Sequence, residues 1–128
     1  MHDLNYIHRD IKPDNIMMGL GENSNTVFLI DFGLTRLVID PKTGKHIPFV
    51  GRKNLIGTCR YVSVNSHKGF ELSRRDDLTT LGYVIINLIK GSLPWQGIKI
   101  SKHSARYSKV GNFKEKYPIE KLCRGCPI

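Results

Sequence analysis

The stretch HRDIKPDN, at residues 8–15, places a lysine and two carboxylates a few positions apart, with an asparagine directly behind them. Moving a phosphoryl group from a nucleotide to a hydroxyl needs such a set of groups. A carboxylate orients and deprotonates the hydroxyl, a cation lies beside the phosphate, and two further groups hold magnesium. The stretch fits the pattern H-R-D-x-x-x-x-N. It predicts Asp10 as the base, Lys12 as the cation and Asn15 as one metal ligand.

A second polar motif supplies the other metal ligand. In IDFGL, Asp31 is followed by the Phe32–Gly33 pair. Because Asn15 is neutral, it limits repulsion between the two ligands and leaves Asp10 free to accept a proton. Either triplet alone recurs by chance, and such residues can also be solvated loop charges or caps. Their order, on either side of a predicted hairpin, favours the chemical interpretation.

The elements around these motifs follow from local patterns. Two short apolar runs, at 16–18 and 27–30, flank the segment GLGENSNT, and that composition is typical of a β-hairpin. Residues 35–66 carry proline, glycine and scattered charges without a clean period. We expect a long ordered loop there, and such a loop in a compact domain is usually functional.

Helices are expected in the second half of the chain. Apolar residues recur at helical spacing over 76–90, and the pattern stops at Gly91. Apolar residues also occupy the other positions of this segment, so the helix is expected to be buried nearly all round. A weaker, polar helix is expected at 101–114, and Pro118 is placed to open a short one at 119–123. The whole reads as one unit, mainly α with a short β-hairpin.

Charge is the compositional outlier, since 20 Lys and Arg against 11 Asp and Glu give +9. Such an excess favours anionic partners, although a solvated face would give the same composition. Nucleic acid ranks last among these partners, because the basic residues are not interleaved with aromatic platforms. No apolar run is long enough to span a bilayer, and no secretion signal opens the chain. Three cysteines suggest a reducing compartment, and the lone C-x-x-C at Cys123 and Cys126 suggests thiols rather than a zinc site.

Over nearly all of its length the chain resembles the C-terminal lobe of a serine/threonine protein kinase of the casein kinase I family. The stretches that carry the resemblance are HRDIKPDN, MGLG, IDFGL, HIPF, KNLIGTCRY, SRRDDLTTLGY and GSLPWQG. The triplet SVN at 63–65 resembles the Ser-Ile-Asn of that family, where most kinases have Ala-Pro-Glu. The resemblance implies an incomplete α+β fold of the protein-kinase type. It also implies ATP and Mg²⁺ as cofactors. The implied protein is a monomer of the cytoplasm, and also of the nucleus, that binds neither DNA, RNA nor membrane.

The resemblance also implies roles for further residues. Thr58 resembles the threonine that ties the substrate-binding loop to the catalytic Asp and Lys. Asp77 resembles the carboxylate that holds the backbone of the catalytic loop, although a helix-dipole partner would also fit its position. Basic residues at Lys53, Arg60 and Arg106 correspond to a site for a phosphate already on the substrate. Proteins with acidic or phosphate-primed Ser/Thr segments are therefore the expected substrates. The alternative is that these three cations only steady the loop.

The resemblance implies that residues 1–128 form a partial kinase domain, with the N-terminal lobe absent. A glycine-rich lid, a strand lysine and an adenine-binding hinge normally precede the HRD motif. Here seven residues precede His8, and GLGENS at 19–24 lacks the final glycine of G-x-G-x-x-G. Two functions remain open. The chain is a fragment of an active serine/threonine kinase, itself inactive alone, or it is an inactive short product that binds phosphopeptides or partners.

Overall fold

The computed structural model describes residues 1–51, 54–98 and 103–127. Within these residues it has four α-helices, α1 (Val64–His67), α2 (Arg74–Lys90), α3 (His103–Lys116) and α4 (Ile119–Cys123). Within helix α3, side chains are described from residue 107 onward. Two antiparallel strand pairs join β1 (Tyr6–Ile7) to β4 (Arg36–Leu37) and β2 (Ile16–Met18) to β3 (Val27–Leu29). Short 3-10 turns occupy His2–Leu4, Pro13–Asn15, Gly21–Asn23 and Phe32–Leu34.

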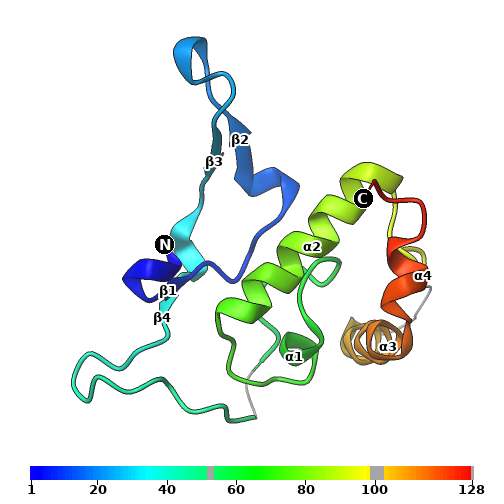
Figure 1. Ribbon diagram of the computed structural model, residues 1–128. Helices are drawn as coiled ribbons and strands as arrows, with labels where there is room; N and C mark the ends of the chain where they lie inside the picture. The colour runs from blue at the N-terminus through cyan, green and yellow to red at the C-terminus, as the bar shows by residue number, and fades with distance from the viewer. Residues whose placement is uncertain (52–53, 99–102, 128) are drawn as a thin grey trace.

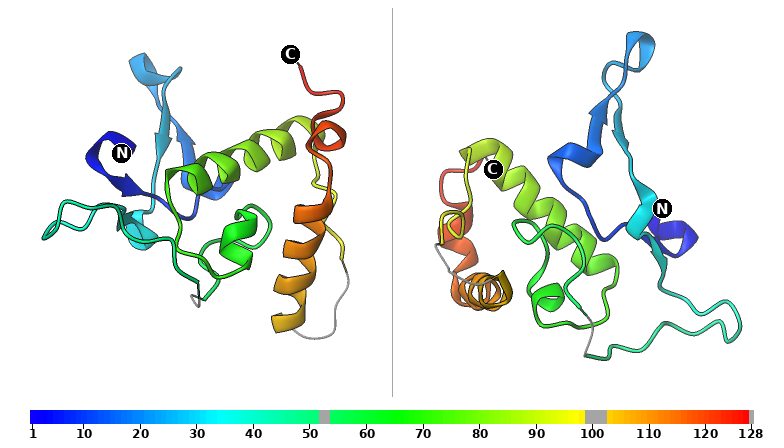
Figure 2. Two further views of the ribbon diagram at one scale, coloured as in Figure 1. Left: turned by 60° about the horizontal axis from the view of Figure 1, so that its bottom comes forward. Right: turned by 180° about the vertical axis from the view of Figure 1, so that it is seen from behind.

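Helix α2 crosses the middle of the molecule (Figure 1). The pair β1–β4 and the N-terminus lie on one side of α2, and α3 and α4 lie on the other, as the views in Figure 2 also show. The β2–β3 hairpin projects away from the helices. The polar loop of residues 8–15 therefore runs between the strand pair and α2, at the base of this hairpin.

The predicted hairpin is confirmed, with strands at Ile16–Met18 and Val27–Leu29. The backbone N–H of Gly19 donates to the carbonyl of Thr26 at 2.9 Å and closes the hairpin end. A Cβ at Gly19 would lie 2.2 Å from the carbonyl oxygen of Asn23, so only glycine fits this turn.

Helix α2 is also confirmed, and it begins two residues earlier than predicted, at Arg74. Ser73 and Asp76 form a capping box, in which the backbone N–H of Ser73 donates to Asp76 at 2.8 Å. The same buried carboxylate accepts hydrogen bonds from the side chains of Ser63 at 2.8 Å and Asn65 at 2.9 Å. One carboxylate thus caps α2 and fixes α1 beside it.

The expectation that α2 is buried nearly all round is wrong. Val84 is 0% exposed and Ile86 8% exposed, whereas Leu78 and Leu88 are 60% and 66% exposed. In the described part of the chain, the core covers only one side of the helix. The apolar residues on its other positions form a second, exposed stripe made of Leu78, Ile85, Leu88 and Ile89.

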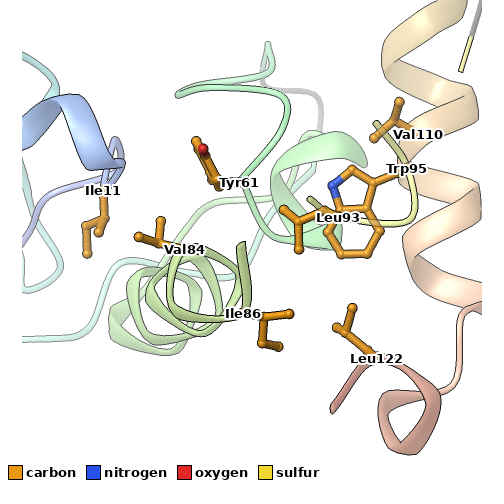
Figure 3. Packing of buried hydrophobic residues seen from close by; sticks show 8 residues of the cluster. All are labelled: Ile11, Tyr61, Val84, Ile86, Leu93, Trp95, Val110 and Leu122. Atoms are coloured by element: carbon orange, nitrogen blue, oxygen red, sulfur yellow. The ribbon is translucent and has the colours of Figure 1, made fainter. Parts of the chain in front are cut away.

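The main core lies between α2, the loop before α1, and the α3–α4 pair (Figure 3). Its buried members are Ile11, Tyr61, Val84, Ile86, Leu93, Trp95, Val110 and Leu122. A smaller cluster joins Ile7 of β1, Val38 directly after β4, and Leu72. Ile11 belongs to the polar loop, so the core anchors that loop through its one buried aliphatic side chain.

The remaining expectations hold in part. Helix α4 spans Ile119–Cys123 with Pro118 as its N-cap residue, as predicted. Helix α3 spans His103–Lys116, while positions 101 and 102 of the predicted helix lie outside the described residues. The expected loop at 35–66 is more structured than predicted, because it contains β4, a bridge between Ile39 and His46, and the start of α1.

Candidate active site

The backbone of residues 8 and 9 is held by one buried carboxylate from α2. Asp77, 3% exposed, accepts hydrogen bonds from the backbone N–H of His8 at 2.7 Å and of Arg9 at 2.9 Å. The ring nitrogen Nε2 of His2 lies 2.9 Å from the same carboxylate. Arg9 has a φ of 70°, which lies in the left-handed region of backbone conformation. Because that conformation is unfavourable for a residue with a side chain, the two bonds to Asp77 help to fix the turn that presents Asp10.

Asp10 is the centre of a cluster of short polar contacts. Its carboxylate, in a residue 8% exposed, accepts a hydrogen bond from the Thr58 hydroxyl at 2.7 Å and pairs with the Lys12 ammonium at 2.8 Å. The side-chain amide of Asn15 donates to the Asp10 backbone carbonyl at 2.9 Å. The structure therefore brings together four of the sequence-predicted residues, including Thr58 from 48 positions away.

The same contacts set the charge of this cluster. Burial acts to raise the pKa of Asp10, but hydrogen bonds from Lys12 and Thr58 outweigh it and hold the pKa below its ordinary value. The hydrogen bond to Asp10 raises the pKa of Lys12, because it outweighs the opposing effect of burial. Both groups are therefore ionised at neutral pH. Asp10 is a carboxylate that can accept a proton, and Lys12 is a cation.

Asn15 and Asp31 are placed by backbone contacts between their segments. The N–H of Ile30 donates to the Asn15 carbonyl at 2.9 Å, and His8 Nε2 lies 3.0 Å from the Ile30 carbonyl oxygen. Asp31 is exposed, has a φ of 62°, and accepts from the Gly33 N–H at 3.2 Å. The strand pair β2–β3 thus brings the end of the polar loop beside the start of IDFGL.

This donor set fits a magnesium ion bound together with nucleotide phosphates. The Asn15 amide nitrogen is used as a donor, so its carbonyl oxygen is the atom that would ligate a cation. Asp31 offers an exposed carboxylate, and its negative charge contributes to the raised pKa of Lys12. Among the described residues, no three His, Cys, Asp or Glu side chains gather as a metal cluster. Magnesium is commonly bound by one or two carboxylates plus substrate phosphates and water, which suits such a sparse set.

Gly57 allows the segment that carries Thr58 to approach the polar loop. Its φ is +90°, and a Cβ there would lie 2.4 Å from the carbonyl oxygen of Arg9. The backbone can therefore pass close enough for Thr58 to reach Asp10. Arg9 in turn donates from Nε to the Leu34 carbonyl at 2.5 Å, which ties the loop to the segment after Asp31.

A buried lysine that sequence reasoning missed holds the chain just after Thr58. Lys114 of α3, 5% exposed, donates from Nζ to the carbonyls of Cys59 at 2.9 Å and Val62 at 2.7 Å. Its ammonium also lies 5.2 Å from the Tyr83 ring centroid and 5.0 Å from that of Trp95. Burial lowers the pKa of Lys114 to about 7, against a smaller opposing effect of Cys59.

Trp95 makes a parallel contact, because its indole N–H donates to the Arg60 carbonyl at 2.7 Å. Together, Lys114 and Trp95 bind the carbonyls of residues 59, 60 and 62 and so fix the segment beside Thr58. The sequence gives one signal for Lys114. It lies at the end of the stripe Tyr107, Val110 and Gly111, the small and apolar face of α3.

The three cations predicted to bind a substrate phosphate are described only in part. Arg60 is exposed, and its guanidinium carbon lies 5.8 Å from the Tyr61 ring centroid. Lys53 lies outside the described residues, and so does the side chain of Arg106. Arg60 therefore lies two residues after Thr58, and its side chain is exposed to solvent rather than buried in the core.

Two further findings bear on the class of protein. None of the helices in the described part of the chain combines the length and the apolar character needed to cross a membrane. The family model named protein kinase domain matches residues 1–123 of the 128 in this chain.

Proposed function

This chain belongs to the protein kinase family, and on that premise we propose that its active site is that of a serine/threonine kinase resembling casein kinase I. The reaction is transfer of the γ-phosphoryl group of ATP, with Mg²⁺, to Ser or Thr of acidic or phosphate-primed proteins. One observation carries the proposal. The buried Asp10 carboxylate is held ionised between the Thr58 hydroxyl and the Lys12 ammonium.

Each residue of this cluster has a part in the transfer. Asp10 orients the substrate hydroxyl and accepts its proton as the oxygen attacks phosphorus. Lys12 offsets the negative charge that the transferred group carries, and Thr58 holds Asp10 toward the substrate side. Asn15 and Asp31 would hold the metal. When bound, Mg²⁺–ATP supplies the phosphoryl group and neutralises charge between its phosphates.

Recognition of a phosphate-primed substrate is proposed for Arg60, together with Lys53 and Arg106. Arg60 supports this because it is exposed and because its backbone is fixed through its own carbonyl by Trp95. A guanidinium can bind two oxygens of a phosphate dianion at once. The net charge of +9 further favours an acidic or phosphorylated peptide.

The activity test uses the 128-residue chain alone and the same chain joined to the N-terminal lobe of a casein kinase I enzyme. Residues 1–128 contain no G-x-G-x-x-G lid, so we expect the chain alone to leave casein unphosphorylated. The joined protein should phosphorylate casein on Ser and Thr, and Asp10→Ala should abolish this with nucleotide binding largely kept. Asp31→Asn should instead weaken metal-dependent nucleotide binding. The reverse pattern would contradict the assignment of these two roles. An inactive joined protein that still binds phosphopeptides would support the alternative of a binding module.

Substrate priming is tested separately in the joined protein. Arg60→Ala should cost about 1–3 kcal/mol in kcat/KM for a phosphate-primed peptide, and much less for the same peptide without phosphate. Arg124→Ala, which removes another exposed arginine after α4, is the matched control and should leave both values unchanged. Equal losses on the two peptides would show that Arg60 holds the loop rather than the substrate phosphate.

A further inference from the structure

Helix α3 has two faces with different surroundings. Tyr107, Val110, Gly111 and Lys114 face α1 and the segment after Thr58. On the other face, side chains at helical spacing line a groove with a volume of about 420 Å³. The residues that line this groove are Ile98, Lys109, Asn112, Phe113, Lys116 and Tyr117. The active-site loop uses none of these residues, so the groove is a separate feature of the surface.

Two aromatic rings line this groove. The rings of Phe113 and Tyr117 are stacked, with centroids 5.4 Å apart and planes inclined at 23°. Phe113 is 38% exposed, whereas Tyr117 and Ile98 of the same groove also pack against the main core. Rings that stack on each other and remain open to solvent offer a surface on which an apolar side chain can be buried.

The rim of the groove carries positive charge. Lys109 and Lys116 line it, and the Lys121 ammonium of α4 lies 5.5 Å from the Tyr117 ring centroid. Among the described acidic side chains of α3, Glu115 is ion-paired with Lys68 at the end of α1 and does not line the groove. An apolar wall between lysines is complementary to an apolar side chain between carboxylates.

We infer that this groove is a docking site for an acidic segment of a partner protein, with a Phe or Leu side chain buried against Phe113 and Tyr117. The lysines would pair with Asp or Glu on either side of that anchor. A second copy of this chain is disfavoured as the occupant, because two surfaces with lysine rims on chains of charge +9 repel each other. Docking of a partner at this groove does not depend on phosphoryl transfer.

The binding test uses the 128-residue chain and a fluorescent peptide in which Phe and Leu are interspersed among Asp and Glu. The peptide has no Ser, Thr or Tyr, so it cannot be a phosphorylation substrate. Phe113→Ser should weaken binding about tenfold or more, since a central aromatic anchor carries much of such an interface. Phe28→Ser is the matched control, because Phe28 is similarly exposed, at 45%, but lies on the hairpin strand β3.

Charge is tested with a second pair of variants. Lys109→Glu with Lys116→Glu should abolish peptide binding, whereas Lys42→Glu with Lys45→Glu makes the same change in net charge at exposed positions far from α3. Equal losses in the two double variants would mean attraction by net charge alone and would overturn the inference. So would unchanged binding in Phe113→Ser, or binding that survives replacement of Phe and Leu by Gly in the peptide. Thermal unfolding of each variant shows whether the helix itself is intact.

Peptide binding and casein phosphorylation are independent measurements. If the chain binds the acidic peptide through Phe113 but the protein joined to an N-terminal lobe fails every kinase assay, the docking site stands and the proposed activity is refuted. The chain is also tested for binding to an acidic phospholipid vesicle and to single-stranded DNA. If either binds, and the variant with Lys109→Glu and Lys116→Glu loses that binding as fully as it loses the peptide, a protein partner is contradicted. Dimerisation that depends on Phe113, measured by sedimentation, would assign the groove to a second copy instead.

Discussion

Removing the buried charge of Lys114 should change how the stability of the protein depends on pH. Its pKa is about 7 in the folded chain and 10.5 ordinarily. Between these values the unfolded chain retains the proton and the folded chain releases it, so raising the pH favours the folded state. From pH 7 to pH 9, this linkage adds about 2 kcal/mol to the free energy of unfolding. Below pH 7 both states hold the proton, and the increment vanishes.

The substitution Lys114→Met isolates this contribution. Methionine has a similar length and does not titrate, so the increment of about 2 kcal/mol should be missing from the variant. A neutral amine still has two N–H donors for the two carbonyls that Lys114 binds, so deprotonation need not release the loop. The assay is urea unfolding of both proteins at several pH values from 6 to about 9.

The matched control is Lys116→Met, the same change two positions along α3 at an exposed lysine. Its free energy of unfolding should follow the wild-type pH dependence. Because Cys59 affects the pKa of Lys114, the comparison is repeated in a Cys59→Ala background. If wild type and Lys114→Met gave parallel curves in both backgrounds, the burial argument for Lys114 would be refuted.

Two further predictions concern the backbone of the site. Gly57→Ala should lower the free energy of unfolding, measured in urea, by about 1–3 kcal/mol more than Gly44→Ala does. Both glycines have a positive φ, but only a Cβ at Gly57 would clash, with the carbonyl of Arg9. Equal losses in the two variants would contradict this. Asp77→Asn should speed hydrogen exchange at the amide of His8 or Arg9 by about tenfold, since an amide can accept one of these bonds but also presents an N–H; unchanged exchange would show that other contacts hold the loop.

The elements that the sequence predicts well are those with local signals. The hairpin has glycine and asparagine between two apolar runs, α2 has a helical period and ends at Gly91, and Pro118 marks the start of α4. The pair β1–β4 could not be predicted, because two-residue strands separated by about thirty positions have no detectable period. The burial of α2 was overestimated because apolar residues all round a helix do not show which face the core covers.

The site divides in a similar way. The residue types and spacing of HRDIKPDN are enough to suggest Asp10, Lys12 and Asn15. Phosphoryl transfer needs a base, a cation and metal ligands, and this short stretch supplies all three. The position of Lys114 at the end of a small and apolar stripe of α3 is only a weak signal, because lysine is rarely buried and its partners are backbone carbonyls, which have no sequence signature. The same holds for Trp95 and its bond to the Arg60 carbonyl. These supports appear only once the loop and the helices are placed in space.

The bonds from His8 and Arg9 to Asp77 also have a consequence for the order in which the protein folds. They join residues 69 and 68 positions apart, so a long loop must close before either bond forms. During synthesis, residues 8–15 leave the ribosome well before α2 exists. They have no carboxylate to bind until residue 77 has emerged and its helix has packed. The loop at the start of the chain is therefore among the parts that acquire their native conformation late.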